Sequence, residues 1–575
     1  MSSRFRLLVG FGVVAAVLAV PALAVAGHTT TPRTPNLTPL GHIEQQRLTG
    51  GPGDPGNPTD PTSPDIHTDL GFWGNIAVQG TWLGFHLRDV SNPNAPATIS
   101  YTSCRGNQGD VMIYDNIVVR SWNSPASTTP GGTQNPLGRA ETNCDGEPVA
   151  AGFEGIHVFD ITNRADPQLV AQIATPNGSH TATAVPDPEN GRLLVYNSAS
   201  SAATPQIDII TIPLSAPQNA TLIRSVPAGG ACHDISVIFG DANIATCAGG
   251  NGFRVFDIGQ NQWPGGSKTS PELLYRVNVP TVTIGHSAAF SWDGEIIVFG
   301  HEPGGGTQSE CEATDDPAKK SFYFYRASDG ALLGTWVLPR PQGPNENCTL
   351  HNFNTVPFLD RHILVHGDYQ AGTGVLDFTN PAAPVELAWA DPPAEPTPPA
   401  GTPAFFCTST PPGCALGGAW ATYWYNGPLW ETHISEGLNV WQVDEPWWNR
   451  ALNLTHMNPQ TQEDTLECTV RASSSLRARR AGRVNVNVRV WNQAPKMGLR
   501  VRLRGAGVNR VATTNANGVL RTSIRANRAG TLRINVLDTL VMDGCSTSRR
   551  VAAAPRPRRG GGNLGGGAGL TGRAR

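Results

Sequence analysis

The chain has 575 residues, more than one ordinary hydrophobic core accommodates, so we expect two or more domains. It contains 64 Gly and 48 Pro, and only 15% of its residues are charged. Short apolar runs bounded by Gly, Pro, Asn and Asp recur along the chain, and long helical periodicity is absent. This pattern predicts an all-β protein and argues against a mainly helical one.

The charge is distributed very unevenly, although the net charge is only −3. Residues 465–575 contain 22 Arg and Lys against 3 Asp and Glu, a net charge of +19, whereas the rest of the chain contains 20 against 42, a net charge of −22. The sequence therefore predicts an acidic body and a basic C-terminal module that contacts an anionic polymer.

The first 26 residues predict a secretory signal peptide. Arg4 and Arg6 form a positive segment, Leu7 to Val20 is an apolar core, and small residues lead up to Ala26, where we expect cleavage. No other apolar run approaches 18 residues, so we predict no transmembrane segment. We expect a secreted protein, extracellular or on the cell surface. Its basic strands lack an aromatic stacking pattern, so an anionic polymer of the cell envelope is a better partner than nucleic acid.

Residues 27–66 are rich in Pro, Gly and Thr and predict a loosely ordered lead-in. Between residues 67 and 447 one pattern of apolar runs recurs, and each repeat ends in an Asp-containing turn, as in EGIHVFDITNRADP (154–167) and GTGVLDFTNPAAP (372–384). Counting the repeats by their first strand yields seven units of about 54 residues, which predicts a seven-bladed β-propeller. We expect residues 448–464 to be a linker.

Several of these segments are long and distinctive. They include DLGFWGNIAVQG, GIHVFDITN, GSHTATAVPDPENGRLLVY, CHDISV, GHSAAFSWDGEIIVFGHEPGGG, NCTLHNFNTVP and VLDFTNPAAPVELA. The region 67–447 resembles the LVIVD-repeat β-propeller proteins, a family of secreted or surface proteins. The resemblance implies the fold and the location. It implies no activity, because none is assigned to the family in general.

Residues 465–550 predict a separate small domain. The strings VNVNVRVWN, LRVRLRGAG, GVLRTSIRA and TLRINVLDT alternate apolar with polar or basic residues, as half-buried antiparallel strands do. The region resembles the immunoglobulin-like β-sandwiches appended to bacterial secreted proteins. It lacks the Cys–Trp–Cys spacing of antibody domains, so only the architecture is implied. Residues 551–575, rich in Gly and Arg, predict a disordered basic tail.

Ten cysteines in an exported chain predict disulfides. Pairing each cysteine with its neighbour along the chain predicts five bonds: Cys104–Cys144, Cys232–Cys247, Cys311–Cys348, Cys407–Cys414 and Cys468–Cys545. The last pair brackets the small C-terminal domain. A thiolate metal site is the less favoured alternative, because no CxxC pair occurs.

Four histidines open four successive apolar runs, at intervals of 53, 53 and 65 residues. They are His180 in GSHTATAV, His233 in ACHDISVI, His286 in GHSAAFSW and His351 in LHNFNTVP. In a propeller the first strand of each blade lines the central channel. One histidine at the start of that strand in each of four blades therefore predicts four imidazoles at one mouth of the channel.

Several neutral imidazoles without a thiolate favour zinc, copper or iron over calcium, and we expect the four histidines to be the ligands of such an ion. Six further residues are expected near the same mouth, where they would orient the ligands or wall the site: Asp110, Glu302, His301, His366, Asp368 and Trp420. By analogy of fold alone, propellers with axial histidines hold iron or copper in some oxygenases and reductases.

Two other interpretations of the four histidines stay open: a site for a small polar ligand without metal, and a structural role in which each imidazole satisfies buried backbone groups. The function therefore has two candidates. The first is a secreted binding protein whose axial site takes a metal, a small ligand or a protein partner, held to the envelope by its basic module. The second is a secreted metalloenzyme, an oxidoreductase or hydrolase. The sequence contains no recognisable catalytic motif, which favours the first.

Overall fold

The computed structural model describes residues 27–44, 66–106, 108–126, 143–199, 205–240, 242–259, 263, 265–306, 308–394, 407–409, 412–414, 417–463, 468–490, 498–515, 517–537 and 544–554. Within them, the regular elements are β-strands and six short 3₁₀ segments: η1 (Gly27–Thr30), η2 (Pro188–Asn190), η3 (Pro217–Asn219), η4 (Pro303–Gly306), η5 (Pro317–Lys320) and η6 (Trp448–Arg450). The predicted signal peptide lies outside the described residues.

Most strands form four-stranded antiparallel units in chain order. The first two contain β2 (His67–Trp73), β3 (Ile76–Thr81), β4 (Gly84–Asp89), β5 (Ala97–Ser103), then β6 (Val111–Tyr114), β7 (Ile117–Trp122), β10 (Gly155–Asp160) and β11 (Gln168–Ala174). The next two contain β12 (Ala182–Asp187), β13 (Arg192–Ser198), β14 (Gln206–Pro213), β15 (Thr221–Pro227), then β16 (Asp234–Phe239), β17 (Ile244–Gly249), β18 (Gly252–Asp257) and β19 (Glu272–Asn278).

A further unit contains β20 (Gly285–Phe290), β21 (Ile296–His301), β22 (Ser321–Arg326) and β23 (Leu332–Val337). An eight-stranded sheet joins β24 (Asn352–Val356), β25 (Ile363–Gly367), β26 (Thr373–Asp377) and β27 (Val385–Ala390) to β30 (Ala419–Trp424), β31 (Leu429–His433), β32 (Gly437–Val443) and β1 (Leu37–Glu44). Its two halves meet at a parallel pair between β24 and β30. Two small hairpins pair β8 (Asn143–Cys144) with β9 (Glu147–Pro148) and β28 (Cys407–Ser409) with β29 (Pro412–Cys414).

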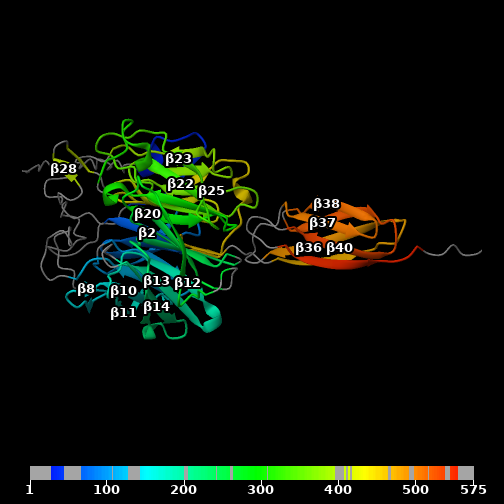
Figure 1. Ribbon diagram of the computed structural model, residues 1–575, viewed down its shortest axis with the longest axis horizontal. Helices are drawn as coiled ribbons and strands as arrows, with labels where there is room; N and C mark the ends of the chain where they lie inside the picture. The colour runs from blue at the N-terminus through cyan, green and yellow to red at the C-terminus, as the bar shows by residue number, and fades with distance from the viewer. Residues whose placement is uncertain are drawn as a thin grey trace, which may run out of the picture.

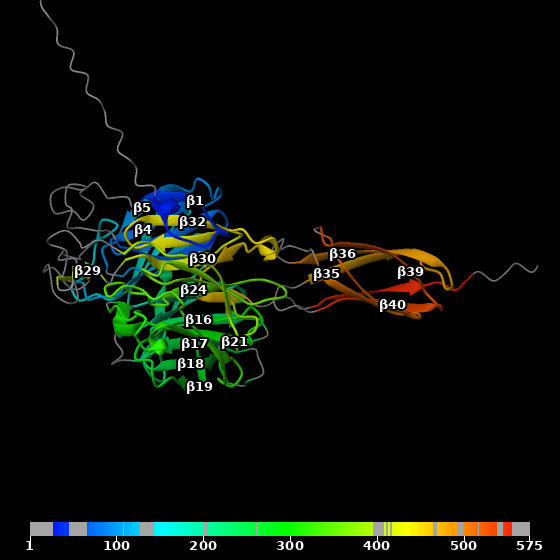
Figure 2. The same cartoon turned by 90° about the horizontal axis from the view of Figure 1, so that it is seen from above.

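The innermost strands form a closed ring around a central channel. They are β2, β6, β12, β16, β20, β24 and β30, and each contacts the next, with β30 returning to β2. Figure 1 shows the propeller beside the C-terminal unit, and in Figure 2 the strands β16, β17, β18 and β19 follow one another from the centre of the propeller outward. Apolar side chains fill the space between neighbouring sheets, for example Phe253, Phe290 and Phe299. The chain therefore contains a β-propeller, which confirms the predicted architecture.

The N-terminal strand completes the last sheet of the propeller. We expected residues 27–66 to be a loosely ordered lead-in, but Leu37–Glu44 forms β1, which pairs antiparallel with β32 from Leu37↔Val443 to Glu44↔Gly437. Without β1, strand β32 would present an unpaired edge of backbone donors and acceptors, which is costly and prone to aggregation. The two ends of the propeller chain are therefore joined within one sheet.

Residues 456–463, which we call the channel segment, lie across one end of the ring and pair with its strands. Strand β33 (His456–Met457) pairs with β2, and β34 (Thr461–Glu463) pairs in parallel with β16. The side-chain amide of Asn458 accepts from the Ile113 N–H at 2.9 Å and donates to the Ile113 carbonyl at 2.8 Å. Gln462 makes the same pair of bonds with Phe290, at 2.9 and 2.8 Å.

The channel segment corrects the expectation that residues 448–464 form a linker. Two of its side-chain amides present one donor and one acceptor each, as a backbone edge does, and so extend the strands they meet. Thr461 Oγ1 also donates to the Ala184 carbonyl, and Tyr425 OH donates to the Thr455 carbonyl. The polar sequence that predicted a solvated linker therefore provides the hydrogen bonds that close one end of the channel.

The C-terminal unit consists of two sheets packed over one apolar core, and it lies to one side of the propeller (Figure 1). One sheet contains β35 (Cys468–Ser474), β36 (Ala481–Val490) and β39 (Val519–Arg525), and the other contains β37 (Arg500–Gly505), β38 (Val508–Thr513), β40 (Gly530–Val536) and β41 (Ser546–Val551). Valine and leucine side chains point inward, and arginines alternate outward.

Four of the five predicted disulfides are confirmed: Cys104–Cys144, Cys232–Cys247, Cys311–Cys348 and Cys468–Cys545. Cys407 and Cys414 stand opposite each other in the hairpin of β28 and β29, but their side chains lie outside the described part of the chain. Among the described residues, none of the helical segments is long and apolar enough to span a membrane.

Candidate functional site

The structure brings His180, His233, His286 and His351 together at one mouth of the channel. Each lies at or just before the start of an innermost strand, in β12, β16, β20 and β24 in turn. Neighbouring imidazole centroids are 4.0, 4.2 and 4.1 Å apart along the series. Equivalent positions of successive sheets face the same channel. Four turns of the chain that are far apart in the sequence therefore place four imidazole rings side by side.

The Nδ1 atoms of the first two rings face hydrogen-bond acceptors. His180 Nδ1 lies 2.9 Å from Asn123 Oδ1, and His233 Nδ1 lies 3.0 Å from the carboxylate of Asp234. Because a hydrogen-bond acceptor lies beside Nδ1, the neutral imidazole carries its proton on Nδ1. Its Nε2 atom then keeps a lone pair. The Nε2 atoms of these two rings are 2.6 Å apart.

The other two rings are held in the same way. His351 Nδ1 donates to the carbonyl of Trp420 at 2.6 Å. His286 Nδ1 lies 2.6 Å from Ser287 Oγ, whose own proton is directed at Asp234 Oδ2, 2.7 Å away. Ser287 therefore accepts from His286. In all four imidazoles Nδ1 faces a hydrogen-bond acceptor, which is the arrangement that orients a ligand to a metal ion through Nε2. The Nε2 atom of His351 also lies 3.0 Å from the hydroxyl of Tyr369.

Glu302 adds a carboxylate to the four Nε2 atoms. Its oxygens lie 4.0 Å from His233 Nε2, 3.8 Å from His286 Nε2 and 3.6 Å from His351 Nε2. Two ligands that each stand about 2.1 Å from one ion are at most about 4.2 Å apart. These separations are therefore compatible with a single ion between the imidazoles and the carboxylate. One ligand atom from each of His233, His286 and Glu302 also lies within 4.8 Å of the other two.

Three of the four imidazoles are held in the neutral form, which is the form that binds a metal ion. Burial lowers the pKa of His180 to about 3 and that of His351 to about 4, and it holds the pKa of His286 well below its usual range. Burial also disfavours the charged form of His233, but Asp234 and Glu302 outweigh it and raise its pKa. A metal ion that binds to His233 therefore displaces a proton from this imidazole.

Tyr369 stands beside the proposed ligands and was not identified from the sequence. Its hydroxyl lies 3.0 Å from His351 Nε2 and 3.1 Å from Glu302 Oε1. Its backbone has φ 46°, a left-handed conformation that costs energy for a residue with a Cβ and that accumulates at functional sites. Burial raises the pKa of Glu302 to about 7, so this carboxyl carries a proton near neutral pH.

Asp110 and Trp420 also line the site. The imidazoles, Asp69, Asp110 and Trp420 surround a cavity of ≈ 20 Å³. Asp110 accepts from the Ala182 N–H at 2.6 Å and so fixes the start of β12 rather than a histidine ring. Burial raises the pKa of Asp69 to about 6, and burial with the neighbouring Asp69 raises the pKa of Asp110 well above its usual range.

His301, His366 and Asp368 were expected near the mouth, but the structure does not bring them to the imidazoles. His301 precedes Glu302, so alternation along the chain points it the other way, where Nε2 accepts from the Thr283 N–H at 3.3 Å. His366 is paired with Asp368 at 2.8 Å, and both are fully buried. His366 packs between aromatic rings of the neighbouring sheet, Phe322 and Trp336.

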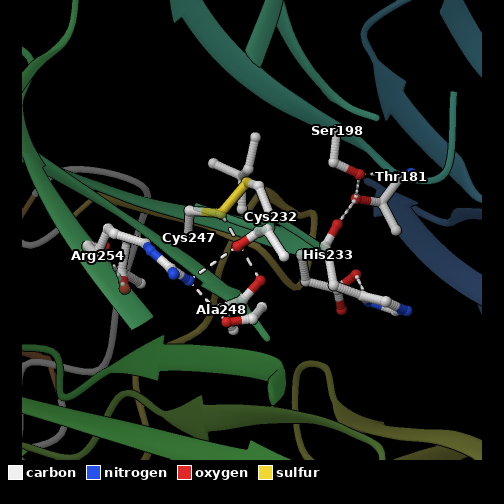
Figure 3. Close-up of a disulfide and its surroundings, with 12 residues drawn as sticks. Thr181, Ser198, Cys232, His233, Cys247, Ala248 and Arg254 are labelled. Carbon is white, nitrogen blue, oxygen red and sulfur yellow. Dashed lines mark hydrogen bonds and ion pairs between the residues drawn. A yellow bond between two sulfur atoms is a disulfide. The ribbon is translucent and has the colours of Figure 1, made fainter. Parts of the chain in front are cut away.

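A disulfide anchors the turn that carries His233 (Figure 3). Cys232 precedes this histidine and is bonded to Cys247 of β17. Arg254 Nη1 donates to the carbonyls of Ala231 at 2.8 Å and Gly249 at 2.6 Å. The His233 N–H donates to the Ala248 carbonyl at 2.6 Å. These contacts fix the backbone of the turn on both sides, which positions the imidazole before any ligand arrives.

Comparison with known proteins yields only distant similarities. No protein-family model and no curated protein matches the chain, so membership of the LVIVD-repeat family stays a prediction. Among solved structures, the N-terminal domain of Nup159 is 9% identical with a TM-score of 0.40, and the match covers 71% of this chain and 95% of that one.

Two other solved structures are similar at the same level. The β-propeller domain of Myceliophteria thermophila Cps50 (Swd1) is 11% identical with a TM-score of 0.32, over 52% of this chain and 80% of that one. The extracellular domain of the one component system BT4673 from B. thetaiotaomicron is 8% identical with a TM-score of 0.37, over 90% and 58%. Similarity at this level does not bear on function, and the propeller is established by its own strand order.

Proposed function

We propose that this chain is a secreted, seven-bladed β-propeller protein that binds one transition-metal ion on its axis through His180, His233, His286 and His351. The observation that carries the proposal is the orientation of the four rings. Each Nδ1 faces an acceptor, so each neutral ring presents its Nε2 lone pair to the mouth. The Nε2 atoms of His180 and His233 are 2.6 Å apart, and those of His233, His286 and His351 lie 3.6 to 4.0 Å from the Glu302 carboxylate. Two lone pairs 2.6 Å apart repel each other unless they share a proton or both bind one positive ion beside them.

Seven blades follow from dividing the eight-stranded sheet at its parallel pair between β24 and β30. Four imidazoles and a carboxylate, without thiolate, suit zinc, iron or copper in its oxidised state. The four disulfides support an oxidising compartment.

The test is elemental analysis of the untagged mature protein after purification without chelator. We expect close to one equivalent of zinc, iron or copper, lost in the folded double variant His233→Ala, His286→Ala. The control is His456→Ala, which changes a histidine in the channel segment, away from the mouth. Absence of metal from the parent protein, even after reconstitution with each ion, would leave the four histidines with a structural or ligand-contacting role.

A second candidate, a metalloenzyme, is favoured by Glu302 and Tyr369. A carboxyl group that stands beside the proposed ion and accepts from the Tyr369 hydroxyl at 3.1 Å is placed to transfer a proton. Metal-loaded protein would be screened for oxygen consumption and ester hydrolysis, with Glu302→Gln as the matched variant. An activity that Glu302→Gln abolishes while the metal stays bound supports an enzyme, whereas equal background rates in both proteins reject it.

The C-terminal unit is proposed to be an immunoglobulin-like sandwich that holds the protein to an anionic polymer of the cell envelope. Its described residues contain no Asp or Glu. One sheet exposes Arg471, Arg483, Arg489, Arg521 and Arg525, and the other exposes Arg500, Arg502, Arg504, Arg533 and Arg550. Side chains between these arginines are mainly Asn, Ser and Thr, so both faces are basic and hydrophilic, as a polyanion requires.

A further inference from the structure

We propose that the axial ion takes an exchangeable ligand of at most three non-hydrogen atoms, which enters from the histidine mouth. This inference rests on the proposed metal site. A cavity needs roughly 10–15 Å³ to hold one water molecule, and the space among the imidazoles, Asp110 and Trp420 is ≈ 20 Å³. Glu302 is not among the residues that line this space, so an ion held between Glu302 and the imidazoles leaves the space to one small ligand.

The proposed ion is covered on one side and open on the other. The side chains of His286, His351 and Glu302 are only 4%, 2% and 7% exposed, whereas that of His233 is 22% exposed. The solvent-facing side is therefore the one next to His233 and its neighbour His180. A ligand that exchanges with solvent reaches the ion from that side.

The opposite end of the channel offers no second entrance along the described residues. The channel segment crosses it, and Gln460 Nε2 donates to Asp69 Oδ2 at 3.4 Å. Asp69 is one of the residues that line the cavity. The floor of the cavity thus meets the segment that closes the channel, so molecules come and go only through the mouth.

Trp420 limits the size of what enters. Its side chain lines the cavity, and its ring packs edge-on against His351 with centroids 4.8 Å apart. The hydrogen bond from His351 Nδ1 is accepted by the backbone carbonyl of Trp420 and does not involve the indole. Removing the indole therefore enlarges the cavity while the hydrogen bond that orients His351 is retained.

The experiment uses the full mature chain loaded with copper(II) and two probes of different size. Azide has three non-hydrogen atoms, and imidazole has five. We expect azide to produce a charge-transfer absorption band and a changed electron paramagnetic resonance spectrum that saturate on titration. Imidazole is expected to bind roughly 100-fold more weakly to the parent protein. In Trp420→Ala, imidazole affinity should rise about tenfold and azide affinity should change little.

Each outcome decides the proposal. Imidazole binding to the parent as tightly as azide overturns the size limit, and no response to azide in copper-loaded protein overturns the open position; in both cases the metal site itself stands. Failure to bind copper, measured separately by elemental analysis, overturns the proposed function instead. If Trp420→Ala does not fold, the comparison of the two probes on the parent protein still tests the size limit.

Discussion

Ser287 connects two parts of the site through one hydroxyl, which accepts from His286 Nδ1 and points its own proton at Asp234. Asp234 in turn accepts from His233 Nδ1. Ser287 and Asp234 together thus orient two of the four imidazoles. Partners of this kind raise the basicity of a ligating ring and fix its tautomer, and their loss typically weakens metal binding 10–100-fold.

We expect Ser287→Ala to weaken metal binding by roughly 10–100-fold, measured by competition with a chromophoric chelator. The matched control is Ser236→Ala, which removes a buried hydroxyl from β16 that donates to the Ala288 carbonyl and touches no imidazole. Equal affinities in the two variants would show that Ser287 does not support the ligand.

A second prediction concerns acid stability. His157 is buried, both of its ring nitrogens lack a partner among the described residues, and burial lowers its pKa to about 3. In the unfolded chain the imidazole of His157 takes up a proton near pH 6.5, but in the folded protein it does not. The contribution of the neutral imidazole to the free energy of unfolding is therefore fully present above pH 6.5 and is lost as the pH falls towards 3.

The variant His157→Phe keeps an aromatic ring that cannot be protonated. From pH 7 to pH 5, it should lose about 2 kcal/mol less unfolding free energy than the parent, since one pKa unit corresponds to about 1.4 kcal/mol. Urea unfolding at the two pH values measures this difference. An unchanged pH dependence would mean that His157 is protonated equally in both states.

The sequence located the four histidines because each opens a repeat, and repeats place equivalent positions around one axis. It did not identify Asn123, Ser287 or Tyr369 as partners of the rings, since those contacts join different sheets or depend on rotamers. Asp234 could have been found, because it directly follows His233. His366 and Asp368 lie at the end of a second strand, as His301 and Glu302 do, but they face a neighbouring sheet. Alternation along a strand does not tell which side chains face the mouth and which face the next sheet.

At the scale of elements, the channel segment replaces backbone pairing with side-chain pairing. Asn458 and Gln462 each satisfy a buried N–H and a buried carbonyl on β6 and β20. Leaving such groups unsatisfied costs about 1–3 kcal/mol each. The polar composition that predicted a linker could not reveal these contacts, because their backbone partners lie 345 and 172 residues earlier in the chain.

We expect Asn458→Ala to lower the unfolding free energy of the propeller by about 2–4 kcal/mol, because two buried backbone groups lose their partner. The control, Asn509→Ala, removes an amide from an exposed position of β38 and should change stability by less than about 0.5 kcal/mol. Chemical denaturation followed by tryptophan fluorescence compares them. Similar effects of the two substitutions would show that the segment adds little to the ring.

At the scale of the whole molecule, charge separates the chain into an acidic propeller and a basic sandwich. We expect the full chain to bind soluble polyphosphate, with an affinity that falls steeply as salt rises, because screening weakens contacts between exposed charges. Truncation after residue 464 keeps the channel segment and removes the basic module, so it should abolish binding. It also exposes Trp292 and Leu452, which pack against the core of the sandwich, so folding of the truncated protein is checked separately. Unchanged binding in the truncated protein would contradict the proposed anchoring role.

The channel segment also determines where mechanical force enters the molecule. The sandwich begins at Cys468, five residues after the last residue of β34, so tension from an anchored sandwich is transmitted first to the centre of the ring and not to an outer strand. Strand β34 runs parallel to β16, which loads their hydrogen bonds together in shear. The first part of the propeller to feel the pull is therefore the floor beneath the four imidazoles, where Gln460 meets Asp69.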